Sequence, residues 1–155
     1  MTTKPSLRTD GTTLTHTLGS GAVAWTLPIR AIVVIAEYTT NEGPYADDYF
    51  LTFVTVEDGQ PFYSSCSFYV EGRDRVLLEI SNRLGSQIEL GLANSTEWTS
   101  RVIWPPSMTD QEYFTFKAIP PKSIFQKVRL RILGSELEYK VSDVVRNYVS
   151  AQANT

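Results

Sequence analysis

Residues 47–70, DDYFLTFVTVEDGQPFYSSCSFYV, decide the fold because they encode a β-hairpin. Aromatic and β-branched residues fill two runs on either side of Asp58 and Gly59, a dipeptide that is typical of a two-residue hairpin turn. Such a turn places Glu57 opposite Gln60, and the pairing then continues outward along both runs. We therefore predict two long antiparallel strands at the centre of the protein.

The two faces of this hairpin have different predicted roles. One face carries Leu51, Phe53 and Cys66, and its apolar character predicts a place in the core, where the thiol is structural rather than reactive. The reverse face mixes aromatic rings with small hydroxyl groups, a composition that suits either contact with a ligand or packing beneath a helix. Tyr63 and Tyr69 on this reverse face are candidate binding residues.

The segments around the hairpin alternate between strand-like and helix-like patterns. Residues 12–27 predict another hairpin, and residues 30–39 predict a central strand because their apolar run suits burial on both faces. Residues 73–84 have the spacing of an amphipathic helix that stops at Gly85. Residues 86–92 return to alternation and predict a strand.

The rest of the chain adds strands and a final helix. Residues 97–108 and 111–122 each predict a strand that runs into a Pro-Pro pair, residues 124–133 and 136–141 predict a hairpin, and residues 142–152 predict a C-terminal helix. No βαβ alternation occurs, which argues against a parallel sheet. We predict an α+β fold with a mainly antiparallel sheet, one internal helix and one C-terminal helix.

The length of 155 residues is that of a single domain. We predict a flexible N-terminal leader over residues 1–11, followed by one α+β domain over residues 12–155. In element order alone, the chain loosely resembles a pleckstrin-homology-type domain. In such a domain the sheet curls into a barrel, and a terminal helix caps the barrel. This resemblance implies a curled sheet or a PH-like barrel.

The composition limits the chemistry that the chain can perform. One cysteine, Cys66, and one histidine, His16, exclude an intramolecular disulfide and multi-cysteine metal sites. His16 is expected to be an ordinary strand or loop residue. No metal or cofactor is expected, since no phosphate-binding or calcium-binding motif occurs. The longest apolar run is far shorter than the ~20 residues of a membrane helix, and we predict a soluble cytoplasmic protein.

Charge is distributed unevenly along the chain. Residues 31–72 contain seven acidic residues and no Lys or Arg, whereas residues 113–135 contain five basic residues and no acid. Lys127, Arg129 and Arg131 are candidate partner-binding residues, because they form a stripe that could face an acidic protein segment, a phosphorylated lipid headgroup or a second copy of the chain. Nucleic acid is disfavoured as a partner, since the isoelectric point is about 5.2.

Three acidic residues near the first long strands are weak candidates for catalytic residues: Glu37, Asp47 and Asp48. Two nearby carboxylates can act as acid and base or bind a hard cation. Asp47 and Asp48 are adjacent, however, so in a strand their side chains point to opposite faces. We therefore predict a non-enzymatic binding domain, with a protein partner favoured over a small ligand. The alternative is a small carboxylate-based or metal-assisted hydrolase that uses Glu37 with Asp47 or Asp48.

Overall fold

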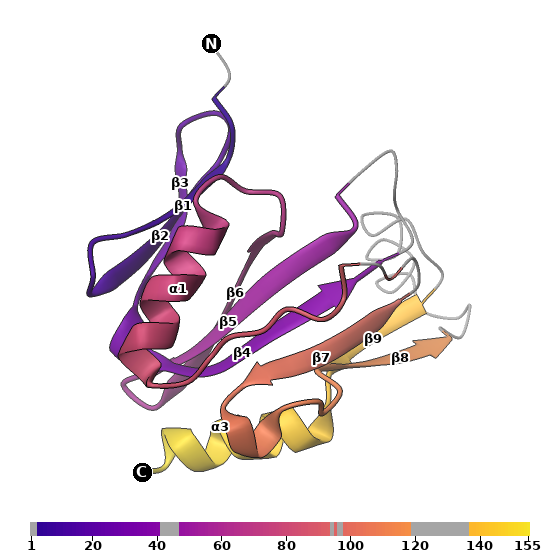
Figure 1. Ribbon diagram of the computed structural model, residues 1–155. Coiled ribbons are helices and arrows are strands. Elements are labelled where there is room, and N and C mark those ends of the chain that lie inside the picture. Colours follow the sequence, from indigo (N-terminus) through magenta and orange to yellow (C-terminus); the bar gives the residue numbers. More distant parts are fainter. Residues whose placement is uncertain (1–2, 41–46, 94, 96–97, 119–136) are drawn as a thin grey trace.

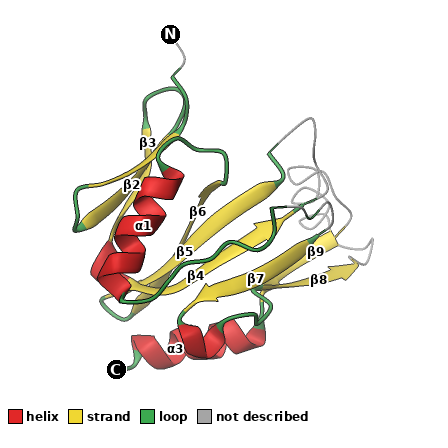
Figure 2. Ribbon diagram, viewed as in Figure 1, coloured by secondary structure: helices red, strands yellow, loops and turns green. Residues whose placement is uncertain are grey.

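The computed structural model describes residues 3–40, 47–93, 95, 98–118 and 137–155. Within these residues the chain forms three antiparallel sheets and two α-helices (Figures 1 and 2). The strands are β1 (Ser6–Thr9), β2 (Thr13–Thr17), β3 (Val23–Pro28), β4 (Ile32–Thr39), β5 (Tyr49–Glu57), β6 (Gln60–Ser67), β7 (Thr99–Trp104), β8 (Phe114–Ala118) and β9 (Leu137–Val141). The helices are α1 (Arg73–Leu84) and α3 (Asp143–Ala153). The predicted α+β class is confirmed.

The largest sheet has four strands in the order β6-β5-β4-β7. β4 lies inside this sheet between β5 and β7, as its apolar sequence predicts. The smaller sheets have the orders β1-β2-β3 and β8-β9. Over the described residues these three sheets remain separate and do not close into a barrel. The predicted strand at 124–133 lies outside the described residues.

The β5–β6 hairpin has the predicted register. Glu57 lies opposite Gln60, and the pairing extends as far as Phe50 opposite Ser67. Asp58 and Gly59 have φ angles of 51° and 75°, which is the left-handed conformation that a two-residue hairpin turn requires. Local turn chemistry is therefore enough to set the register of the longest strand pair among the described residues.

The core has two halves, one on each face of the central sheet. On one face Leu51, Phe53 and Cys66 belong to a buried cluster with residues of α1 and of the β1–β3 sheet. On the other face, the buried cluster includes Val145 and Val149 of α3. Figures 1 and 2 show the same arrangement, with α1 and α3 well separated and the central sheet between them.

The first strand, β1, lies in the segment that the sequence predicts as a flexible leader. Leu7 is buried and lies opposite His16 on β2. The Leu7 N–H also donates to the Glu71 carbonyl at 2.8 Å, which ties β1 to the start of α1. Residues 6–9 are therefore part of the folded structure. The sequence did not predict this strand because it contains only one apolar residue.

The single histidine and the single cysteine are both buried. His16 lies on β2, and its Nδ1 is 3.1 Å from the Ser6 carbonyl oxygen. Cys66 lies on β6 in the core, as predicted, and burial raises the pKa of its thiol to about 12. A thiol with so high a pKa is almost entirely protonated at neutral pH, which fits a structural role.

The raised pKa of Cys66 predicts a loss of stability at high pH. The unfolded chain releases the thiol proton near pH 9, whereas the folded chain keeps it up to about pH 12. The contribution of Cys66 to stability is thus complete below pH 9 and is lost as pH rises through this window, by up to about 1.4 kcal/mol per pH unit. Urea unfolding between pH 8 and pH 11 should show a steeper decline for the wild type than for Cys66→Val. Equal slopes would contradict the burial of the thiol.

Neither helix in the described part of the chain is long and apolar enough to cross a membrane.

Candidate functional site

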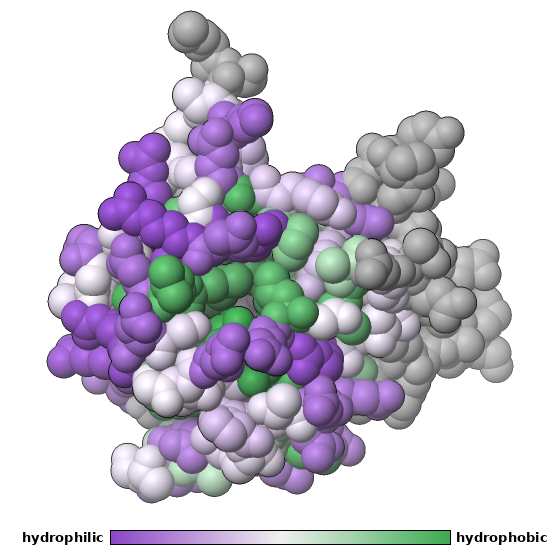
Figure 3. All heavy atoms as spheres, viewed as in Figure 1, coloured by the Kyte–Doolittle hydropathy of each residue, from purple (hydrophilic) through white to green (hydrophobic). Residues whose placement is uncertain are grey.

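A groove of about 590 Å³ lies between α1 and the chain that follows it. Its apolar lining comes from Leu77 and Leu78 on α1 and from Ile88 and Leu90 beyond the helix. Figure 3 shows apolar residues gathered in a hollow on this face, with polar residues around them. The volume is within the range of about 300–1,000 Å³ that is common for ligand sites.

The helix α1 forms the first wall because its sequence is amphipathic. Val76, Leu77 and Ile80 are buried, while Leu78 is 63% exposed. Gly85 ends the helix with a φ of +63°, a conformation that glycine adopts without strain. The chain can therefore reverse and return alongside the helix that it has just left (Figure 1).

Residues 86–92, which we call the groove segment, form the second wall. Burial alternates as the sequence predicts, with Ile88, Leu90 and Leu92 half-buried and the residues between them exposed. The predicted strand is nevertheless wrong, because this segment joins none of the sheets in the described structure. It runs as an extended coil beside the central sheet (Figure 1).

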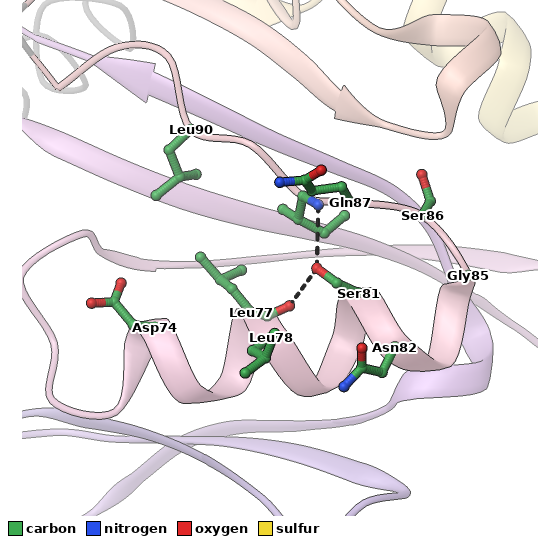
Figure 4. A pocket seen from close by; sticks show the side chains of 10 residues that line it. Asp74, Leu77, Leu78, Ser81, Asn82, Gly85, Ser86, Gln87 and Leu90 are labelled. Atoms are coloured by element: carbon green, nitrogen blue, oxygen red, sulfur yellow. Dashed lines mark hydrogen bonds between the residues drawn. The ribbon is translucent and has the colours of Figure 1, made fainter.

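Side chains hold the groove segment in place where a strand partner would otherwise do so. The Ile88 N–H donates to Ser81 Oγ at 3.2 Å, and this hydroxyl donates in turn to the Leu77 carbonyl at 2.7 Å (Figure 4). On the opposite side, Arg101 Nη2 donates to the Glu89 carbonyl at 2.6 Å. The segment is thus fastened both to α1 and to the central sheet.

A buried carboxylate provides the main anchor of the groove segment. Glu37 on β4 is 0% exposed and lies opposite Arg101 on β7. Its Oε1 lies 3.1 Å from Arg101 Nε and 3.0 Å from Arg101 Nη2, and it accepts the Gly91 N–H at 2.8 Å. Its Oε2 accepts a hydrogen bond from the Tyr49 hydroxyl. We call Glu37, Tyr49, Gly91 and Arg101 the Glu37 cluster.

The environment of the Glu37 cluster stabilises one protonation state of Tyr49 and Arg101. Burial raises the pKa of Tyr49, and the hydrogen bond to Glu37 and the charge of Glu37 raise it further. Burial lowers the pKa of Arg101, but hydrogen bonds to Asp110 and Glu37 outweigh this effect and leave the pKa raised. Arg101 therefore stays charged and Tyr49 stays protonated at physiological pH.

The same cluster is linked to the first turn of α1. The ring of Tyr49 stacks on Phe68, with ring centroids 4.1 Å apart. Arg73 Cζ lies 3.6 Å from the centroid of Phe68, and Arg73 Nη2 pairs with Asp74 Oδ1 at 2.9 Å. Asp74 lines the groove. Both walls of the groove are therefore connected to the Glu37 cluster.

The structure gives different partners to the acids that the sequence proposes as catalytic candidates. Glu37 forms an ion pair with Arg101 and accepts hydrogen bonds from the Tyr49 hydroxyl and the Gly91 N–H. Asp48 instead accepts a hydrogen bond from Tyr69 at 2.9 Å, and Asp47 is exposed. In the part of the chain that the structure describes, no group of three or more His, Cys, Asp or Glu residues could hold a metal ion.

The two candidate tyrosines are both exposed, Tyr63 by 45% and Tyr69 by 59%. The reverse face of the β5–β6 hairpin, on which the sequence places these tyrosines, is partly covered by α3. Val54 on this face is buried in the same cluster as Val145 and Val149 of α3. Partial burial raises the pKa of Tyr63, and the hydrogen bond to Asp48 raises the pKa of Tyr69. Neither tyrosine lines the groove beside α1. The other candidates, Lys127, Arg129 and Arg131, lie outside the described residues.

The sequence does not predict the groove, nor a functional role for Leu78 or Arg101. One signal was available, because Glu37 and Arg101 each place a charge within a strand of otherwise mostly apolar residues. Buried charges are normally paired, so each of them implied a partner. The distance of 64 residues between them concealed the pairing.

The comparisons with known proteins add no functional information. The chain matches no protein-family model, and it is similar to none of the curated proteins or solved structures with which it was compared.

Proposed function

We propose that the protein is a binding module that takes a peptide segment of a partner protein into the groove beside α1. The observation that carries this proposal is the exposed apolar lining of the groove, above all Leu78 at 63% exposure. Water contact with a large apolar side chain is unfavourable, and apolar surface that gathers at a concave site is typical of binding sites.

The walls of the groove are suited to binding because they are held in place before a ligand arrives. The groove segment is fastened by Ser81, by Arg101 and by Glu37. Pre-organisation lowers the entropy that binding would otherwise cost. The polar residues Asn82 and Gln87 also line the groove, and their amide groups can bond a peptide backbone while the leucines contact its side chains.

Replacing Leu78 by glutamate tests this proposal. A random-peptide library displayed on phage is panned against the wild-type protein, and the affinities of the enriched peptides are then measured. We expect Leu78→Glu to weaken binding by about tenfold or more, because an apolar contact at the groove is replaced by a charge. The free energy of unfolding should change by less than about 0.5 kcal/mol, since the side chain is exposed.

Val23→Glu is the matched control. Val23 lies on β3 with an exposure of 61%, close to that of Leu78, but it does not line the groove. It should leave peptide affinity unchanged. Equal losses in both variants, or no loss in Leu78→Glu, would contradict a docking surface at this groove.

A hydrolase that uses Glu37 with Asp47 or Asp48 remains the alternative prediction, and no specific observation favours it. The carboxylate of Glu37 is buried and bonded to other residues, whereas a catalytic carboxylate must reach its substrate. The predicted self-association, the cytoplasmic location and the likeness to a pleckstrin-homology-type domain also stay predictions.

A further inference from the structure

We infer that the peptide binds as an added β-strand along residues 88–90 of the groove segment and places a basic side chain near Asp74. This inference rests on the proposed function and deepens it, since it states the conformation and the charge of the peptide. It is carried by the direction of the backbone groups in the groove segment and by the charge of the groove lining.

The hydrogen bonds of the groove segment show which way its backbone groups point. The Glu89 carbonyl and the Gly91 N–H both bond toward the central sheet, to Arg101 and Glu37. The Ile88 N–H bonds in the opposite direction, to Ser81 on α1. This alternation is that of an extended strand, in which successive residues direct their N–H and C=O groups to opposite sides.

By this alternation, the N–H and C=O of Leu90 and the C=O of Ile88 point toward α1 and into the groove. None of these three groups has a hydrogen-bond partner among the described residues. Figure 4 shows Leu90 on the groove segment and Leu77 on α1 on opposite sides of the groove. The groove thus offers a short free strand edge that faces a helix, an arrangement that an extended peptide can complete.

The charge of the lining argues for a basic residue in this peptide. Asp74 is the one ionisable residue among those that line the groove within the described structure, and its side chain is 83% exposed. Its contacts with Arg73 both go to Oδ1, which leaves Oδ2 for another donor. A Lys or Arg side chain would complement this carboxylate.

A helical peptide fits the same groove less well. A helix bonds its own backbone internally, so it has no groups to offer to Leu90 and Ile88. It would remove their N–H and C=O groups from water without giving them partners, which is unfavourable. An extended peptide satisfies these groups and covers the apolar lining in the same step.

Sequence patterns and backbone methylation of the enriched peptides test this inference. Peptides enriched on the wild type and lost on Leu78→Glu should alternate apolar and polar residues and carry a Lys or Arg. N-methylation of single peptide amides should reduce affinity by about tenfold at alternate positions and have little effect between them, because only every second amide of a paired strand bonds its neighbour. Asp74→Asn should weaken the same peptides several-fold, while Glu112→Gln, which removes an exposed acid outside the groove, should not.

Two results would contradict the added strand. The first would leave the proposed peptide-binding groove intact, and the second would contradict both proposals. Enriched peptides with helical spacing of apolar residues and no alternation in the methylation series would exclude an added strand while leaving a peptide-binding groove. Enrichment of the same peptides on the wild type and on Leu78→Glu would exclude the groove as a docking site and therefore both proposals.

Discussion

Replacing Glu37 by alanine is expected to lower the free energy of unfolding by about 3–5 kcal/mol, since this removes one partner of a buried ion pair. The substitution would remove the acceptor of the Tyr49 hydroxyl and of the Gly91 N–H, and it would leave Arg101 with Asp110 and the Glu89 carbonyl as partners. It should also loosen the groove segment, so the Gly91 amide should exchange hydrogen faster than in the wild type. Urea unfolding and hydrogen exchange measure the two effects.

Two further variants separate the ion pair from the general effect of losing an acid. Glu37→Gln keeps an acceptor of similar size and should lose less stability than Glu37→Ala. Glu89→Ala removes an exposed acid from the groove segment but keeps the backbone carbonyl that Arg101 binds, so it should change stability by less than about 0.5 kcal/mol. If Glu37→Ala were as mild as Glu89→Ala, the Glu37 cluster would not be the anchor of the groove.

Replacing Gly72 by alanine is expected to lower the free energy of unfolding by about 2–4 kcal/mol. Gly72 precedes α1 with a φ of +84°, and a Cβ at this position would lie 2.4 Å from the Leu7 carbonyl oxygen. β1 cannot move away easily, because the Leu7 N–H is bonded to Glu71 at 2.8 Å. The substitution should therefore disturb the junction between β1 and α1.

Gly85→Ala is the control for the backbone conformation alone. Gly85 also has a left-handed φ, of +63°, but a Cβ there would meet no atom within 4 Å. We expect a loss of about 1 kcal/mol from the backbone conformation. The difference between the two glycine variants in urea unfolding then reports the contact with Leu7. Equal losses would show that β1 does not press against the start of α1, contrary to the structure.

The elements that the sequence predicts well are those specified by neighbouring residues. Asp58 and Gly59 determine their turn by local chemistry, and the β5–β6 register follows from it. The periodicity of α1 and the glycine after it predict a helix over residues 73–84, which matches the observed bounds. The Ser142 side chain accepts a hydrogen bond from Val145 and caps α3, and a serine before an apolar stripe is a local signal of the same kind.

The elements that the sequence fails to predict depend on distant residues. The groove segment has the alternation of a strand, yet its bonds run to Ser81, Glu37 and Arg101 instead of to a strand partner. The charge of Glu37 implies a partner, but the sequence does not show which one, because Arg101 lies 64 residues away. The groove itself could not be predicted, since it exists only where α1 and the groove segment lie side by side.

The most direct test of the central claim is a methyl NMR titration of the full chain with a peptide enriched on the wild type. If the groove beside α1 is the docking site, chemical-shift changes should centre on the methyl groups of Leu77, Leu78, Ile88 and Leu90, which line it. Shifts centred on the exposed methyl groups of Val23 or Val144, with the groove leucines unchanged, would contradict the proposal.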